Sequence, residues 1–185
     1  MTNQIFRRLT TTPQMMSVFD DAGILQAMLD FEKALAAAQS KCNIFEPSIA
    51  NTIAECCQIS EFSISDLSES ASRHGTIVVP LVQKLTKLVA FKDQAASDWV
   101  HHGATSQDVI DTAMIIQIKK GLTIIEGDIG RLTSGLESLI IKYSNQIMIG
   151  RTLLQPSVPI TFSEKVRGWQ LALRRNWKRV EMNAA

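Results

Sequence analysis

The chain has 185 residues and a mass of 20.5 kDa, with 45% hydrophobic and 20% charged residues. A mean hydropathy of +0.06 is too high for a disordered chain, and this length can support a core without disulfide bridges. Nineteen basic and eighteen acidic residues leave a formal charge of +1, which excludes a long-range field that gathers nucleic acid or anionic lipid. An anionic ligand would need a local site.

Targeting and cysteine patterns favour a cytoplasmic protein. The N-terminal stretch MTNQIFRRLTTTPQ has no apolar segment behind its charges, and no window reaches the ~20 apolar residues of a membrane span. Cys42, Cys56 and Cys57 have no CxxC or histidine-spaced partners, so we expect neither a disulfide framework nor a zinc site. We also expect no nucleic-acid or membrane partner.

The N-terminal part of the sequence predicts a series of helices. Apolar residues recur at helical spacing over residues 13–39, which predicts one helix that starts near Pro13 or Phe19. Further helices are predicted over residues 47–57, over ISDLSESAS, and over PLVQKLTKLVAF, while the run TIVV fits either extended chain or a buried turn. Together they would form a small helical domain over residues 1–104.

An unbroken apolar stripe dominates the second half of the chain. It predicts a helix from about Ser106 to Met148, about 60 Å long at the helical rise per residue. Its members, three or four residues apart, are Ile115, Ile118, Leu122, Ile125, Ile129, Leu132, Leu136, Leu139 and Tyr143. Other isoleucines lie off this stripe, so more than one face needs burial, and we expect other chains of a multi-helix bundle to cover them.

A second stripe begins at Phe162, after a short connection that contains Gly150, Pro156 and Pro159, and predicts an antiparallel partner helix. No stop signal or return segment follows this stripe, and one and a half helices cannot bury their own apolar surface. We therefore expect residues 105–185 to be the incomplete start of a long-helix bundle in a truncated, all-α chain.

The segment WVHHGATSQDVIDTA, residues 99–113, places hydroxyl residues and an acid where the long helix must begin. Thr105 and Asp108 fit a capping box. The same helix start offers free backbone N–H groups to a carboxylate or phosphate, and Thr105 and Ser106 would add hydroxyl donors. Helix cap and anion site are both open interpretations.

Two of the three histidines lie just before this helix start. His101 and His102 are neighbours in sequence and point to different sides, so at most one of them faces a ligand. A histidine there could donate a proton or orient a ligand, and a purely structural histidine is the alternative. His74 fits a surface position near a helix C-terminus.

The segment GRTLLQPSVPITF, residues 150–162, follows the other end of the predicted long helix. Arg151, Thr152 and Gln155 offer a carboxylate fork, a hydroxyl and an amide, although a simple connecting loop is the alternative. No Gly-rich phosphate loop, Cys/His nucleophile pair or metal cluster accompanies them, so no metal site is expected.

These two segments resemble the first and second conserved segments of the fumarase/aspartase superfamily, which one very long helix also separates. FDDAGILQAMLDFEKALAAAQSKCNIFEP resembles its N-terminal helix, and FSEKVRGWQLALRR resembles the start of its next bundle helix. Within the superfamily the sequence is most similar to the 3-carboxy-cis,cis-muconate cycloisomerases. Adenylosuccinate lyases carry His in the second segment, as GRTHxQ, where this chain has Leu153. The resemblance implies a helical N-terminal domain followed by the central helical bundle of that superfamily.

The resemblance implies an enzyme that interconverts 3-carboxy-cis,cis-muconate and a carboxymuconolactone in protocatechuate degradation, without a metal or organic cofactor. It would act on a small polycarboxylate, with His101 in the catalytic pocket. Substrate-binding roles would fall to Thr105, Ser106, Arg151, Thr152 and Gln155.

The resemblance further implies a homotetramer whose active sites combine three segments from three subunits. The third segment, a mobile loop with a catalytic Ser, would lie beyond residue 185, so these 185 residues alone would be inactive. Two alternatives remain. One is adenylosuccinate lyase or a related lyase of the superfamily, and the other is a non-catalytic helical module whose stripe serves only assembly.

Overall fold

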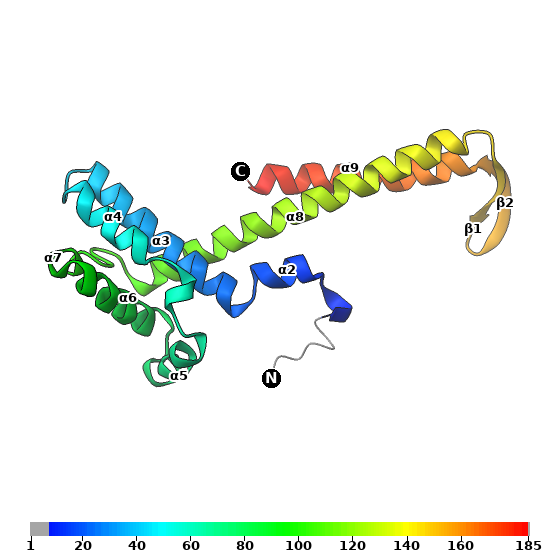
Figure 1. The fold of residues 1–185 in the computed structure, drawn as a ribbon. Helices are drawn as coiled ribbons and strands as arrows, with labels where there is room; N and C mark the ends of the chain where they lie inside the picture. The colour runs from blue at the N-terminus through cyan, green and yellow to red at the C-terminus, as the bar shows by residue number, and fades with distance from the viewer. Residues whose placement is uncertain (1–7, 185) are drawn as a thin grey trace. The chain divides into compact units, whose positions relative to one another are not determined.

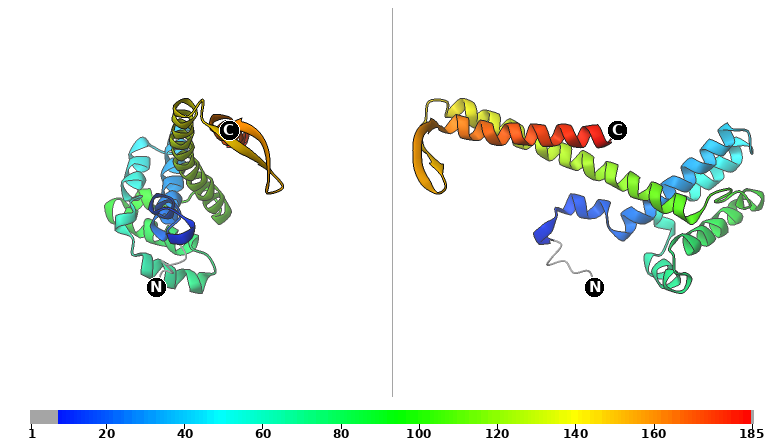
Figure 2. Two further views of the ribbon diagram at one scale, coloured as in Figure 1. Left: turned by 90° about the vertical axis from the view of Figure 1, so that its right-hand side faces the viewer. Right: turned by 180° about the vertical axis from the view of Figure 1, so that it is seen from behind.

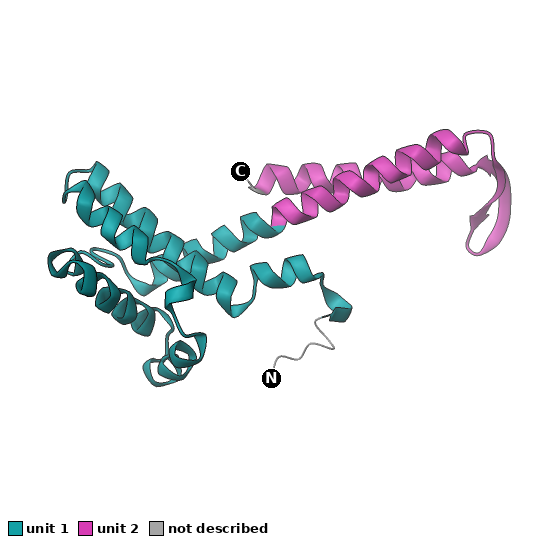
Figure 3. Ribbon diagram, viewed as in Figure 1, with its two compact units in different colours: residues 1–121 teal, residues 122–185 magenta. Residues whose placement is uncertain are grey.

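The computed structural model describes residues 8–184 and divides the chain into two compact units, residues 1–121 and 122–185 (Figures 1 and 3). The first unit contains α2 (Pro13–Val18), α3 (Asp21–Lys41), α4 (Pro47–Cys56), the 3-10 helix η1 (Ile59–Glu61), α5 (Ile64–His74), α6 (Val78–Lys92) and α7 (Gln94–Ser97). Helix α8 (Ser106–Lys142) begins in the first unit and ends in the second, which also contains β1 (Ile147–Thr152), β2 (Gln155–Thr161) and α9 (Phe162–Ala184). The predicted helical fold is confirmed, with one small hairpin added.

The helix predicted over residues 13–39 is interrupted near its start, so that two helices replace it. Asp20 lies outside both helices and caps α3, because its Oδ1 accepts a hydrogen bond from the Gly23 N–H at 2.8 Å. Phe19 ends α2. A short polar side chain that satisfies one of the first N–H groups of α3 thus favours a new helix start over a continuous helix.

The core of the first unit lies between α3, α4 and α6. Its fully buried side chains include Leu29, Ile53, Leu81, Leu85 and Val89. The first turns of α8 join this core through Val109 and Ala113, which are also buried. The first compact unit therefore includes the start of α8.

In the second unit, α8 and α9 run side by side in opposite directions (Figures 1 and 2). Leu136 and Ile140 of α8 bury themselves against Val166 of α9. The buried Gln170 donates from Nε2 to Glu137 Oε2, which adds a polar link between the same two helices. The antiparallel partner helix predicted from Phe162 is confirmed.

A β-hairpin occupies the connection for which the sequence predicted helix and then loop. Helix α8 ends at Lys142, not near Met148, and β1 pairs with β2 in antiparallel register from Ile147↔Thr161 to Thr152↔Gln155. Gly150 marks an irregularity in this pairing, where a Cβ would lie 2.8 Å from the Val158 carbonyl oxygen. No larger residue fits this close approach of the two strands.

Much of the apolar stripe of α8 is exposed in the single chain. Ile115 and Leu132 keep about half of their surface accessible, at 52% and 50%, and Ile118, Ile125 and Leu139 are also exposed. Exposed apolar surface on this scale is typical of an interaction face. None of the helices described in residues 8–184 has the length and hydropathy needed to cross a membrane.

Candidate functional site

Residues 99–105 form a turn that leads into α8 and is anchored to α3. His101 and Gly103 have φ angles of 59° and 73°, in the left-handed region, where Gly103 is favoured because it lacks a Cβ. Gln39 of α3 donates from Nε2 to the His102 carbonyl oxygen at 2.6 Å. The turn that contains the first motif is therefore held by a residue of α3 that lies 63 positions earlier in the sequence.

The two neighbouring histidines contact different groups. His101 Nδ1 lies 2.6 Å from Glu32 Oε1. The His102 ring meets Trp99 edge to face with centroids 4.8 Å apart, and Trp99 packs against Phe45 at 5.1 Å. The His101 ring thus contacts a carboxylate, whereas the His102 ring contacts an aromatic side chain.

Glu32 is a buried acid that the sequence analysis did not single out. Its side chain is 1% exposed, and burial raises its pKa, an effect that the hydrogen bonds from His101 oppose. The same apolar surroundings raise the pKa of the Cys57 thiol to about 12, and the nearby Glu32 charge adds to this rise. A sequence signal was present, because Glu32 shares the core-facing side of α3 with Met28 and Ala36, one turn away on either side.

The start of α8 confirms the predicted capping box. Asp108 Oδ2 accepts hydrogen bonds from the Thr105 N–H at 2.8 Å and from the Thr105 hydroxyl at 2.9 Å, while the Asp108 N–H approaches Thr105 Oγ1 at 3.5 Å. These bonds lower the pKa of Asp108, and the nearby His101 lowers it further. Among the residues that the structure describes, none forms a hydrogen bond with the Ser106 hydroxyl, so Thr105 is the residue that caps the helix.

The second motif lies at the tip of the β1–β2 hairpin. Arg151, Thr152 and Gln155 are all exposed there and flank a two-residue turn. That turn is formed by Leu153 and Leu154, whose φ angles are 46° and 67° and whose surfaces are each 93% exposed. Two bulky residues in the left-handed region are costly, and hairpin turns of this kind prefer Asn-Gly.

The structure thus collects the predicted site residues into two separate groups. His101, Thr105 and Ser106 lie in the first unit, in the turn and at the first residue of α8. The second group, Arg151, Thr152 and Gln155, lies in the second unit at the hairpin tip. The 37 residues of α8, about 55 Å of helix, separate the two motifs along the chain.

The third histidine has a local partner. His74 ends α5, and its Nδ1 lies 2.9 Å from the Ser70 carbonyl oxygen one turn earlier. It is exposed, as expected for a histidine at a helix C-terminus.

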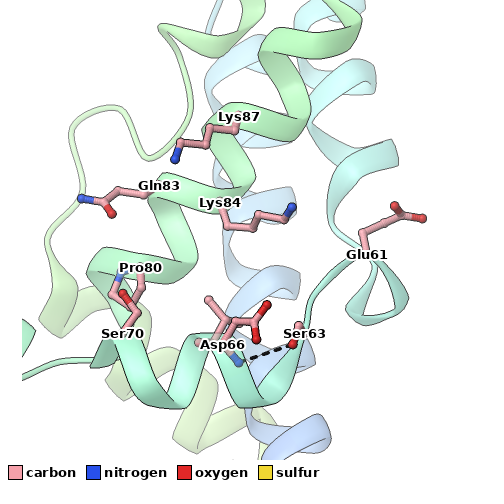
Figure 4. Close-up of a pocket in the computed structure, with 9 residues that line it drawn as sticks. Glu61, Ser63, Asp66, Ser70, Pro80, Gln83, Lys84 and Lys87 are labelled. Atoms are coloured by element: carbon pink, nitrogen blue, oxygen red, sulfur yellow. Dashed lines mark hydrogen bonds between the residues drawn. The ribbon is translucent and has the colours of Figure 1, made fainter. Parts of the chain in front are cut away.

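A cavity of about 390 Å³ lies between α5 and α6 and contains no residue of either motif. Figure 4 shows residues that line it. Acidic and basic groups both line it, so its charge selects no class of ligand. The polar residues around it are Glu61, Ser63, Asp66, Ser70, Gln83, Lys84 and Lys87. Within residues 8–184, no three His, Cys, Asp or Glu side chains gather as metal ligands would.

Comparison with known proteins gives matches along nearly the whole chain. The 3-carboxy-cis,cis-muconate cycloisomerase of Pseudomonas putida is 37% identical over 181 residues, which cover 98% of this chain and 43% of that protein. The crystal structure of 3-carboxy-cis,cis-muconate lactonizing enzyme from Pseudomonas putida has a TM-score of 0.91 at 36% identity, covering 97% of this chain and 41% of that one. The β-carboxy-cis,cis-muconate cycloisomerase from Acinetobacter calcoaceticus sp. ADP1 also has a TM-score of 0.91, at 31% identity, with 97% and 42% covered.

These relatives are longer than the chain, which spans about two fifths of their length. The protein-family model described as lyase matches residues 7–184. Since this match takes in both motifs and the whole of α8, the chain belongs to the lyase family.

Proposed function

We propose that this chain is the N-terminal portion of a cytoplasmic 3-carboxy-cis,cis-muconate cycloisomerase of protocatechuate degradation. The observation that carries the proposal is the difference in hydrogen bonding between two neighbouring hydroxyls at the start of α8. Thr105 is committed to Asp108, whereas the Ser106 hydroxyl beside it has no partner among the described residues. A helix start with an uncommitted hydroxyl suits a substrate carboxylate. The similarity to cycloisomerases over nearly the whole chain supports this assignment.

The reaction needs groups that bind several carboxylates and one that gives a proton to carbon. A carboxylate oxygen of the substrate adds to one carbon of a double bond, and the electron pair moves to the neighbouring carbon. There a second carboxylate stabilises it as an aci-carboxylate until the carbon takes up a proton. In our proposal Ser106 and the first N–H groups of α8 bind one carboxylate, Arg151, Thr152 and Gln155 orient another, and His101 faces the same substrate. No metal or organic cofactor takes part.

We propose that a complete site draws its two motifs from different copies of the chain in a homotetramer. Two observations support this. The length of α8 separates the motifs along one chain, and the exposed stripe of α8 offers a face that further helices could cover.

A related lyase is the second candidate, since the family also contains enzymes that eliminate across a carbon–carbon bond. Leu153 weighs against it. The lyases that this chain resembles carry a histidine for proton transfer at that position, and an apolar residue cannot replace this group.

Ultraviolet absorbance of the conjugated diene tests the proposal. The full-length protein should consume 3-carboxy-cis,cis-muconate equally well with and without a chelator, and the 185-residue chain should not. A full-length protein that leaves the diene intact but releases fumarate from adenylosuccinate or argininosuccinate would instead establish the lyase. Turnover by the 185-residue chain alone would contradict our account of a multi-segment site.

A further inference from the structure

Glu32 and His101 form a pair that joins the interior of the first unit to the first motif. The side chains are 1% and 18% exposed, and Oε1 of the acid lies 2.6 Å from Nδ1 of the ring. An acid this deeply buried is stable in a fold only when hydrogen bonds or charge satisfy it. Here a single residue, 69 positions away in sequence, provides that partner.

Both polar groups of His101 act on the same carboxylate. Its ring and its backbone N–H each stabilise the ionised form of Glu32. The φ angle of His101, 59°, is uncommon for a residue other than glycine, and it belongs to the turn that brings the ring to Glu32. The hydrogen bond engages Nδ1, and Nε2 has no hydrogen-bond partner among the residues that the structure describes.

Two other titratable groups, Cys57 and Asp108, do not compete for the ring. Cys57, at the end of α4, is neutral at physiological pH because burial raises its thiol pKa to about 12. Asp108 is bound to Thr105, although His101 is near enough to lower its pKa. The ring therefore lies between a buried carboxylate and the capped start of α8.

We propose that Glu32 is a positioning residue that accepts the Nδ1–H of His101 and thereby aims Nε2 at the substrate site beside the start of α8. This inference rests on the proposed function, which puts His101 in that site. Glu32 itself does not touch substrate. It fixes the tautomer and the orientation of the ring through the hydrogen bond at Nδ1.

Gln39 provides a matched control within the same helix. It also anchors the turn from α3, but through a hydrogen bond to the His102 carbonyl oxygen, whereas the His101 ring bonds to Glu32. If anchoring of the turn were the whole role of Glu32, then Glu32→Met and Gln39→Met would have the same effect on His101.

Histidine ring NMR of the 185-residue chain gives a test that is independent of catalysis, since there are only three rings to assign. We expect a slowly exchanging Nδ1–H signal from His101 in the wild type and in Gln39→Met, and its loss in Glu32→Met. Persistence of the signal in Glu32→Met, or equal loss in both variants, would overturn the proposal. If circular dichroism finds Glu32→Met unfolded, Glu32→Gln takes its place. This neutral acceptor should shift the signal upfield, and an unchanged signal would count against us.

A double-mutant cycle in the full-length enzyme tests the coupling to chemistry. Glu32→Met should lower kcat/KM by about tenfold or more in the wild type but by less than about twofold in a His101→Gln background. Glu32→Asp should restore part of the loss. Equal losses in both backgrounds would assign Glu32 a structural role only. If the wild-type enzyme has no cycloisomerase activity, the proposed function fails while the NMR result still decides the positioning.

Discussion

Thr105 and Asp108 bind each other across the first turn of α8, and Asp108 Oδ2 receives both the N–H and the hydroxyl of Thr105 at 2.8 and 2.9 Å. Ser106, the next residue, takes no part in this exchange. The two neighbouring hydroxyls thus differ in their hydrogen bonds, and substitutions can separate their effects.

Thr105→Ala should lower the free energy of unfolding by about 0.5–2 kcal/mol, because it removes the helix cap. Ser106→Ala should leave the unfolding free energy nearly unchanged but lower kcat/KM of the full-length enzyme about tenfold, the loss of a hydrogen bond to a charged group. Urea unfolding and steady-state kinetics of both variants measure the two effects. A Ser106→Ala protein with full activity and reduced stability would return this segment to a purely structural role.

The hydrogen bonds from Thr105 lower the pKa of Asp108. This lowered pKa determines the pH range in which the helix cap stabilises the folded protein. A carboxyl group with a lowered folded pKa contributes stability above its unfolded pKa, near 3.8, and loses that contribution as the pH falls through the folded value. The melting temperature of the wild type should therefore exceed that of Asp108→Asn at neutral pH. We expect the two melting curves to converge below about pH 4, and a constant difference down to pH 2 would exclude this linkage.

Leu136 and Leu132 lie one helical turn apart on α8 but differ in burial, at 8% and 50% exposed. Leu136→Ala should destabilise the second unit by about 2–5 kcal/mol, since Leu136 packs against Val166. Leu132→Ala should barely change the stability of a single chain and should instead weaken self-association. Light scattering over a concentration series, together with denaturant unfolding, distinguishes the two. A wild-type chain that stays monomeric at micromolar concentration would refute the proposed interface.

We expect substitutions in the hairpin turn to raise the stability of the protein and lower its activity. Replacing Leu153 by Asn and Leu154 by Gly supplies residues suited to φ angles of 46° and 67°, so the double variant should gain about 1 kcal/mol or more in stability. If the tip lines the substrate site, its kcat/KM should fall, because strained residues concentrate where function requires them. Thermal melts and diene kinetics on the same samples provide the measurements. A variant that gains stability at full activity would show that the leucines have no functional role.

The longer helices α3, α6 and α8 were predictable because their apolar residues recur at helical spacing. The capping box was predictable for a related reason, since Thr105 and Asp108 interact over three residues and need no tertiary partner. The break at Asp20 was missed although a signal was present, an acid placed just before an apolar run.

The hairpin and Glu32 were missed for different physical reasons. The turn contains Leu153 and Leu154, where turn chemistry would call for Asn and Gly, so the sequence carried no local turn signal. The strand cues were short alternations, at Ile147 and Ile149 and at Val158 and Ile160. Glu32 acquires its partner through the tertiary fold, and no local pattern specifies which residue that is.

The anchoring of residues 101–103 by α3 limits how far the first motif can be transplanted. A peptide or chimaera carrying HHGATSQD would reproduce the letters of the motif but would lack the carboxylate of Glu32 and the amide of Gln39. Without them, the turn would lose the two side-chain hydrogen bonds that tie it to α3. The smallest transferable unit is therefore the motif together with the face of α3 that carries residues 32 and 39. Substitutions in the motif and on this face must then be judged together, because the side chains bond to one another.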